Sequence, residues 1–197
     1  MTKSGSFSSG AILVLSVLYF FGGLEYLIGF FAAVVIHELG HIVVINLCGG
    51  NVRSISVNAF GAVIDYYGIN EMHKELLSIA AGPAAGFALS YAASFFGNFY
   101  SNKLLLTTAG ISLLLSVYNI LPIYPLDGGR FVNALLKIKL SEGKAEQTVR
   151  AIGLITSLTM TIFGLVSIKQ NYGFALLFAA ICTFMVQTGI VKKQSVL

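Results

Sequence analysis

The sequence predicts an all-α polytopic membrane protein with about six transmembrane helices, a small β-hairpin after the second and an unwound Pro/Gly segment at the end of the fourth. Composition is the first reason. Of the 197 residues, 56% are hydrophobic and 10% are charged, whereas soluble domains carry about 25% charged residues. The second reason is a set of apolar runs near the ~20 residues that a helix needs to cross a bilayer. The third is an ionisable motif inside one of these runs.

Six apolar runs account for most of the chain, and each is a candidate transmembrane helix. They cover residues 7–23, 26–47, 76–96, 104–121, 151–168 and 172–191. Only Glu25 is charged between the first two runs, which predicts a tight helical hairpin. We therefore expect residues 1–197 to form a single membrane-embedded domain, with no PDZ or C-terminal regulatory domain.

The distribution of basic residues predicts the orientation in the membrane. With the N-terminus in the cytoplasm, only Lys103 and Lys169 lie outside, and the inside segments hold Lys3, Arg53, Lys74, Arg130, Lys137, Lys139, Lys144, Arg150, Lys192 and Lys193. Cytoplasmic loops of membrane proteins are enriched in Lys and Arg. We expect a multi-pass protein of the cell membrane with both termini cytoplasmic. Because the basic residues sit in loops between apolar runs, the net charge of +4 does not indicate a nucleic-acid partner.

The segment between the second and third runs is not a simple loop. Residues 51–68 read "NVRSISVNAFGAVIDYYG" and are rich in Val, Ile and Tyr with partial alternation. This pattern predicts two short strands around a turn at residues 58–61. The hairpin could receive an unwound substrate by strand addition, or it could only cover the cytoplasmic face.

The motif "HELGH" places three ionisable side chains in the second run. His37 and His41 are four residues apart, so they share one face of a helix and can bind one zinc ion. Glu38 lies between them, where it can act as the general base toward an attacking water. Ionisable residues inside a membrane are expensive and are functional candidates by default. The alternative is a histidine pair that only faces the interior of the helix bundle.

A catalytic zinc site has three protein ligands and one open position, so a third ligand must be found. Cys48 lies ~10 Å along the helix from His41, too far to bind the same ion. The remaining candidates are His73, Asp65, Glu71, Glu75 and Asp127. All but Asp127 lie among other polar residues and have the character of solvated side chains.

Asp127 belongs to "NILPIYPLDGGR" at the end of the fourth run. Pro122 and Pro125 forbid a continuous helix there, and Gly128 and Gly129 permit sharp turns. Unwound backbone at membrane depth is tolerated only where it lines a cavity or is buried in protein. Asp127 can therefore approach the two histidines, because runs two and four cross the membrane in the same direction. The alternative is an Asp in a surface Pro-Gly turn.

"HELGH" in the second run followed by "NILPIYPLDGG" in the fourth resembles the site-2 protease family of intramembrane zinc metalloproteases. The likeness is greatest to the six-span branch of the stage IV sporulation protease. It implies one Zn²⁺ bound by His37, His41 and Asp127, with Glu38 as the catalytic base. It also implies that Asn119, Pro122 and Pro125 bind substrate.

The resemblance further implies that the substrate is a membrane-tethered regulatory protein, such as a pro-sigma factor or an anti-sigma factor, cleaved in or near its transmembrane segment. "AGPAAG", residues 81–86, is similar to the Gly-Pro stretch of the family's third span. Many members have Asn three residues after that Pro, and this chain has Gly86.

Two other classes of function remain to be weighed. A non-proteolytic zinc-binding membrane protein, such as a substrate holder or a metal-handling transporter, would use the histidines but has no need for Glu38. Transporters also tend to have repeated halves, and none is seen here. A purely structural membrane subunit would leave both motifs without a purpose.

Overall fold

A computed structural model describes residues 9–58, 61–166 and 184. The chain divides into two compact units, Met1–Asn119 and Ile120–Leu197. Helix α1 (Ser9–Leu47), strands β1 (Asn51–Asn58) and β2 (Gly61–Tyr67), helix α2 (Met72–Phe99) and nearly all of helix α3 (Lys103–Ile120) belong to the first unit. Helices α4 (Asp127–Leu136) and α5 (Glu142–Val166) belong to the second.

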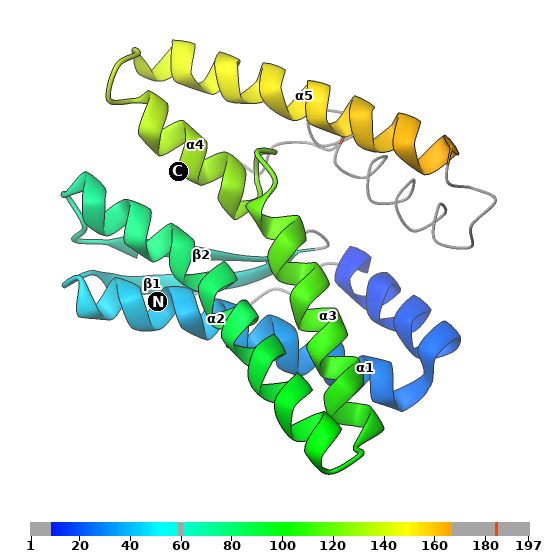
Figure 1. Ribbon diagram of the computed structural model, residues 1–197. Coiled ribbons are helices and arrows are strands. Elements are labelled where there is room, and N and C mark those ends of the chain that lie inside the picture. Colours follow the sequence, from blue (N-terminus) through cyan, green and yellow to red (C-terminus); the bar gives the residue numbers. More distant parts are fainter. Residues whose placement is uncertain (1–8, 59–60, 167–183, 185–197) are drawn as a thin grey trace. The chain divides into compact units, whose positions relative to one another are not determined.

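Helix α1 is two helices joined at Gly23. This glycine has φ 70° and ψ −167°, a conformation that side chains with a Cβ rarely adopt. The chain reverses direction there (Figure 1). The break lies at the boundary expected between the first two apolar runs. On the far side of it, buried residues recur every fourth position along α1, at Ala33, His37, His41 and Ile45.

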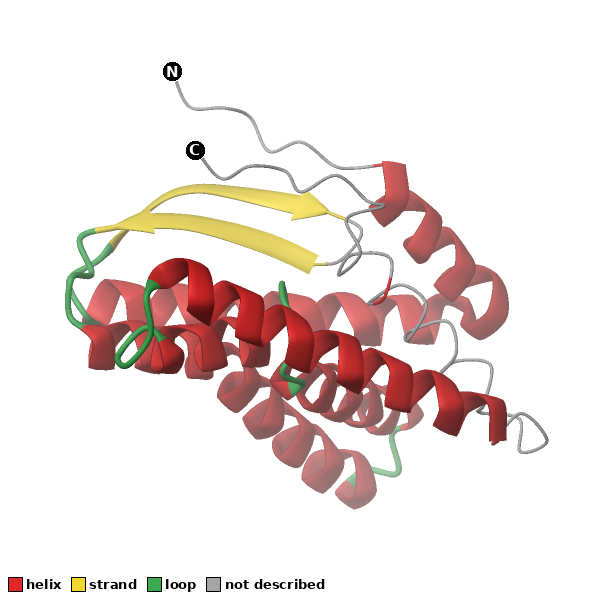
Figure 2. Ribbon diagram, turned by 90° about the horizontal axis from the view of Figure 1, so that it is seen from above, coloured by secondary structure: helices red, strands yellow, loops and turns green. Residues whose placement is uncertain are grey.

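The β-hairpin predicted after the second run is confirmed. β1 and β2 pair antiparallel from Asn51↔Tyr67 to Asn58↔Gly61, with one irregularity between Val52 and Ser54. Figure 2 shows the pair as a two-stranded ribbon. Both strands contact α1, and in the described part of the chain the sheet consists of these two strands.

Helices α2 and α3 form a helical hairpin held by small and hydroxyl-bearing residues. Ser90 Oγ donates to the carbonyl oxygen of Ala109 at 2.9 Å, and Ser112 Oγ donates to that of Gly86 at 2.8 Å. In an apolar surrounding, such bonds satisfy hydroxyl groups that would otherwise be costly to bury. α2 includes Pro83 and extends from Met72 to Phe99, beyond the predicted residues 76–96 at both ends.

The second unit corrects the expected shape of the Pro/Gly segment. Residues 121–126 are non-helical, as Pro122 and Pro125 predict, but Gly128 and Gly129 lie inside helix α4 rather than in sharp turns. The two glycines are needed for close packing instead. A Cβ at Gly128 would lie 2.0 Å from the carbonyl oxygen of Ile120, and one at Gly129 would lie 2.5 Å from the carbonyl carbon of Ile123.

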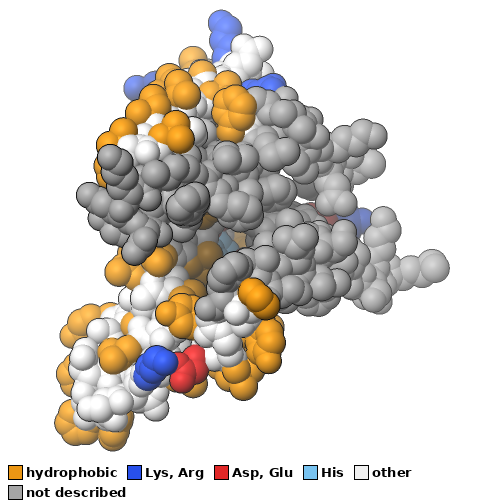
Figure 3. All heavy atoms as spheres, turned by 90° about the vertical axis from the view of Figure 1, so that its right-hand side faces the viewer, with side chains coloured by type: hydrophobic (Ala, Val, Ile, Leu, Met, Phe, Trp, Pro, Cys, Tyr) orange, Lys and Arg blue, Asp and Glu red, His pale blue; other side chains and the backbone are white. Residues whose placement is uncertain are grey.

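Among the residues that the structure describes, four helical segments are long and apolar enough to cross a membrane, namely Gly22–Leu47, Met72–Phe99, Lys103–Ile120 and Glu142–Val166. The expected sixth run falls almost wholly outside the described residues, so the count of six stays a prediction. Large apolar side chains are exposed on all four segments, and such side chains lie on the surface in Figure 3. They are suited to contact with lipid.

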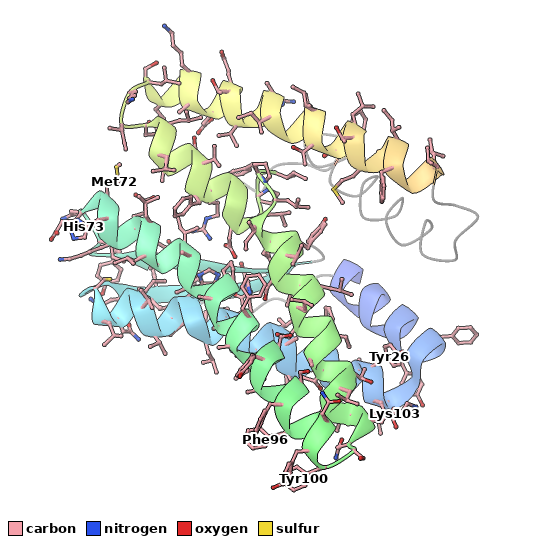
Figure 4. All side chains as sticks on the ribbon, viewed as in Figure 1. Tyr26, Met72, His73, Phe96, Tyr100 and Lys103 are labelled. Carbon is pink, nitrogen blue, oxygen red and sulfur yellow. The ribbon has the colours of Figure 1, made fainter. Side chains whose placement is uncertain are left out.

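Aromatic side chains gather at one end of the α2–α3 hairpin. Phe96, Phe99 and Tyr100 are exposed, and the rings of both phenylalanines contact the ring of Tyr100. Figure 4 shows Phe96, Tyr100, Tyr26 and Lys103 at this end, and His73 at the opposite end of α2. Aromatic rings are enriched at membrane–water interfaces, so this end has the composition of an interface.

Candidate metal centre

His37 and His41 lie on the buried face of α1, with exposed fractions of 4% and 6%. Their ring centroids are 5.0 Å apart and their planes are nearly perpendicular. The i, i+4 spacing brings the rings together as predicted. They are flanked on the same face by Ala33 and Ile45, which are also buried. The motif therefore points into the protein and not toward lipid.

A backbone carbonyl of α2 holds the His41 ring. Nδ1 of His41 lies 2.7 Å from the carbonyl oxygen of Ser78. A carbonyl oxygen can only accept, so Nδ1 carries the proton and donates it. In the neutral ring, Nε2 then presents its lone pair. Metal-binding histidines are commonly oriented by such a bond from the other ring nitrogen.

Two glycines allow α1 and α2 to approach closely around His41. A Cβ at Gly40 would lie 2.6 Å from the carbonyl oxygen of Ala81, and a Cβ at Gly82 would lie 2.1 Å from His41 Nε2. Distances under 3.0 Å are essentially never seen for real Cβ atoms. The ring of His41 thus occupies space that any side chain at position 82 would need.

Glu38 follows His37 in α1 and is half-buried. This exposure differs from that of the two histidines, which are almost fully enclosed. Because its side chain is only partly buried, the Glu38 carboxylate is suited to exchange protons with a water molecule beside the histidine pair.

Asp127 is the first residue of α4 in the second unit and is 7% exposed. Its Oδ1 atom lies 3.6 Å from Nη1 of Arg130, one turn further along the helix. A carboxylate in the first turn is also favoured by the helix dipole. Asp127 is therefore a buried carboxylate at a helix N-terminus and does not lie in an exposed turn. This excludes the alternative that it is a surface Pro-Gly turn residue.

The other candidate ligands have the exposed positions expected of solvated residues. His73 Nε2 pairs with Glu71 Oε2 at 3.1 Å, with 69% and 53% of the two side chains exposed. Lys74 also pairs with Glu71 and lowers the pKa of that carboxyl group. Glu75 is exposed as well, and Asp65 is half-buried in β2.

The residues that the resemblance assigns to substrate follow one another at the end of α3. Asn119 is half-buried, and its Nδ2 donates to the carbonyl oxygen of Leu115 at 3.0 Å. Pro122 is half-buried and Pro125 is exposed in the non-helical segment. Ser78 and Gly82 also lie against His41. Neither role has a chemical signal in the sequence, because Ser78 contributes only a main-chain oxygen and Gly82, although it belongs to the Gly-Pro stretch at residues 81–86, contributes no side chain.

The fold and the motif define a class: a multi-pass helical membrane protein with the His-Glu-x-x-His motif of metallopeptidases buried in one apolar helix. Comparisons with known proteins identify the family within this class. Residues 98–160 match Peptidase family M50. A zinc metalloprotease of Methanocaldococcus jannaschii is 33% identical over 143 residues, which cover 71% of this chain and 42% of that protein. The chain thus spans about two fifths of the length of this relative.

A solved structure is similar over nearly the whole chain. It is the site-2 protease from Methanocaldococcus jannaschii, with a TM-score of 0.73 and 26% sequence identity, and the match covers 95% of this chain and 88% of that one. The chain belongs to the site-2 protease family of peptidase family M50. The family resemblance noted in the sequence is confirmed, whereas its finer assignment to the sporulation branch stays a prediction.

Proposed function

We propose that the protein is a zinc-dependent intramembrane endopeptidase. The observation that carries this proposal is the buried His37–His41 pair in a membrane-spanning helix, with the His41 ring oriented by the Ser78 carbonyl and Glu38 beside it. A histidine pair for metal binding and a neighbouring carboxylate are the parts that metal-assisted peptide hydrolysis requires.

Asp127 is the proposed third ligand. Each of the three side chains is buried within the protein, and two imidazoles with one carboxylate are a donor set that would suit one zinc ion and would leave one of its four positions open. The His41 Nε2 lone pair, oriented by the bond at Nδ1, fits the same role.

The chemistry follows from these residues. When bound, zinc supplies a Lewis acid that activates water and polarises the scissile carbonyl. Glu38 accepts the proton of the attacking water and then donates it to the leaving amine. Asn119, Pro122 and Pro125, in the segment where α3 ends, are proposed to bind the substrate.

The substrate is proposed to be a single-span regulatory protein, of the pro-sigma factor or anti-sigma factor type, cleaved in or near its transmembrane segment. A helical segment hides its carbonyl carbons within its own hydrogen-bonded backbone, so it must unwind before attack. The protein is proposed to lie in the cell membrane with both termini in the cytoplasm, which follows from the excess of basic residues on that side.

The test is cleavage of single-span substrates by the purified protein in liposomes. We expect products cut within or beside the transmembrane segment, as mapped by mass spectrometry, loss of cleavage on zinc chelation, and recovery with added zinc. Zinc binding at one ion per chain without cleavage of any pro-sigma or anti-sigma substrate would instead favour the non-proteolytic zinc-binding protein.

A further inference from the structure

The surroundings of His41 on α2 show a feature that the HExxH motif does not contain. The Ser78 carbonyl oxygen lies 2.7 Å from Nδ1 of the ring. On the same helix, one turn further along, the three heavy atoms nearest to a Cβ built on Gly82 all belong to this ring. They are Nε2 at 2.1 Å, Cε1 at 2.5 Å and Cδ2 at 2.7 Å. One face of α2 therefore accepts a hydrogen bond from the imidazole and also restricts the space in which the ring can lie.

We propose that the Ser78 carbonyl and Gly82 together form a seat for the His41 imidazole, so that Gly82 is a positioning residue for zinc binding. The carbonyl fixes the tautomer and one end of the ring. The missing side chain at position 82 lets the other end, with Nε2, lie against the backbone of α2. This inference rests on the proposed role of His41 as a zinc ligand.

The ring has little freedom to yield to a side chain at position 82. His41 is 6% exposed and Ser78 is 2% exposed, and interiors packed in this way resist added volume. A methyl group at position 82 must therefore displace Nε2, lengthen the Nδ1 bond, or separate α2 from α1.

The geometry separates this role from ordinary helix packing. Gly40 also lies at the α1–α2 crossing, but a Cβ there would meet Ala81 and Ala85 of α2 and not the ring. In α3, a Cβ at Gly110 would meet nothing within 4 Å. Gly82→Ala, Gly40→Ala and Gly110→Ala are thus three Gly→Ala changes in apolar helices. Gly82→Ala acts on the His41 ring, Gly40→Ala acts on helix packing alone, and Gly110→Ala acts on neither.

The first experiment is a double-mutant cycle on zinc-free protein in detergent. Gly82→Ala should lower the melting temperature by roughly 2–12 °C, as overpacking does in a chain of this size. In a His41→Ala background the ring is gone, and Gly82→Ala should then cause no loss. An equal loss in both backgrounds overturns the proposal. If Gly82→Ala alone does not fold, the double variant should fold, and failure of both also overturns it.

The second experiment measures the metal. Gly82→Ala should raise the zinc dissociation constant about 10- to 100-fold, as loss of a supporting contact does at other metal sites, and should change the absorption bands of the Co²⁺-substituted protein. Gly110→Ala should change neither. Gly40→Ala, which acts on helix packing alone, should lower the melting temperature and leave the Co²⁺ bands unchanged. Zinc affinity and Co²⁺ bands of Gly82→Ala equal to wild type overturn the proposal. Absence of zinc binding by the wild type would overturn the proposed function, whereas the zinc-free cycle still tests the seat.

Discussion

The contact between Gly86 of α2 and Ser116 of α3 gives a prediction whose size follows from the structure. A Cβ at Gly86 would lie 2.1 Å from Ser116 Oγ, but 3.5 Å from Ser116 Cβ and 3.6 Å from Ser112 Oγ. The steric conflict is thus with one oxygen atom only. Both residues are buried, and Ser116 Oγ donates to the carbonyl oxygen of Ser112 at 2.8 Å.

Overpacking by itself, before helix propensity is counted, should make Gly86→Ala less stable by about 1–3 kcal/mol. Rotation of the Ser116 hydroxyl away from the new methyl group is the cheapest relief, and it breaks a hydrogen bond worth about 0.5–1.5 kcal/mol. Against this, Ala is favoured over Gly in a helix by about 1 kcal/mol. The net loss expected in the wild-type background is therefore about 0–2 kcal/mol.

In a Ser116→Ala background, the conflicting oxygen is absent and the remaining contacts are ordinary. Gly86→Ala should then stabilise the protein by up to about 1 kcal/mol through helix propensity. The assay is denaturant unfolding in detergent of the two single variants, the double variant and the Gly110→Ala control, whose Cβ meets nothing within 4 Å. The same effect of Gly86→Ala in both backgrounds would refute the packing that relates α2 to α3.

Three further predictions concern the third ligand, the topology and the hairpin. Asp127→Ala should lose zinc in metal analysis of the purified protein, because two histidines alone hold the ion poorly, whereas His73→Ala should keep it; the opposite pattern would move the third ligand to His73. A cysteine at Lys103 should react with a membrane-impermeant reagent in intact cells and one at Lys144 should not; the reverse pattern would invert the topology. Pro substitutions along the exposed edges of the hairpin should block cleavage while zinc content is kept, because Pro removes a ladder donor; normal cleavage throughout would favour a hairpin that only covers the protein.

The strongly patterned parts of the fold could be predicted from the sequence. The run of Val, Ile and Tyr predicted the hairpin, and its strands meet at the expected residues 58–61. The pair of prolines predicted the end of α3 close to residue 121, and the helix ends at Ile120. The i, i+4 spacing predicted a shared face for His37 and His41, and their rings are neighbours. Each of these features depends on local chemistry.

Features set by long-range packing were missed. The short helix α4 was not expected, because two successive glycines disfavour a helix by propensity. Their use becomes clear only when the backbone of Ile120 and Ile123 is seen against them. α5 begins at Glu142 rather than near residue 151, because a polar first part of the helix gives no apolar signal. The Ser78 carbonyl that holds His41 could not be predicted either, since every residue has such a group.

The most direct test of zinc-dependent peptide hydrolysis combines cleavage and metal analysis in Glu38→Gln. The substitution keeps the size of the side chain and removes only its ability to take up a proton. We predict one zinc per chain in both proteins, with cleavage of a single-span substrate by the wild type and a rate lower by about 100-fold or more in the variant. Cleavage by zinc-loaded Glu38→Gln at a rate near that of the wild type would contradict the account.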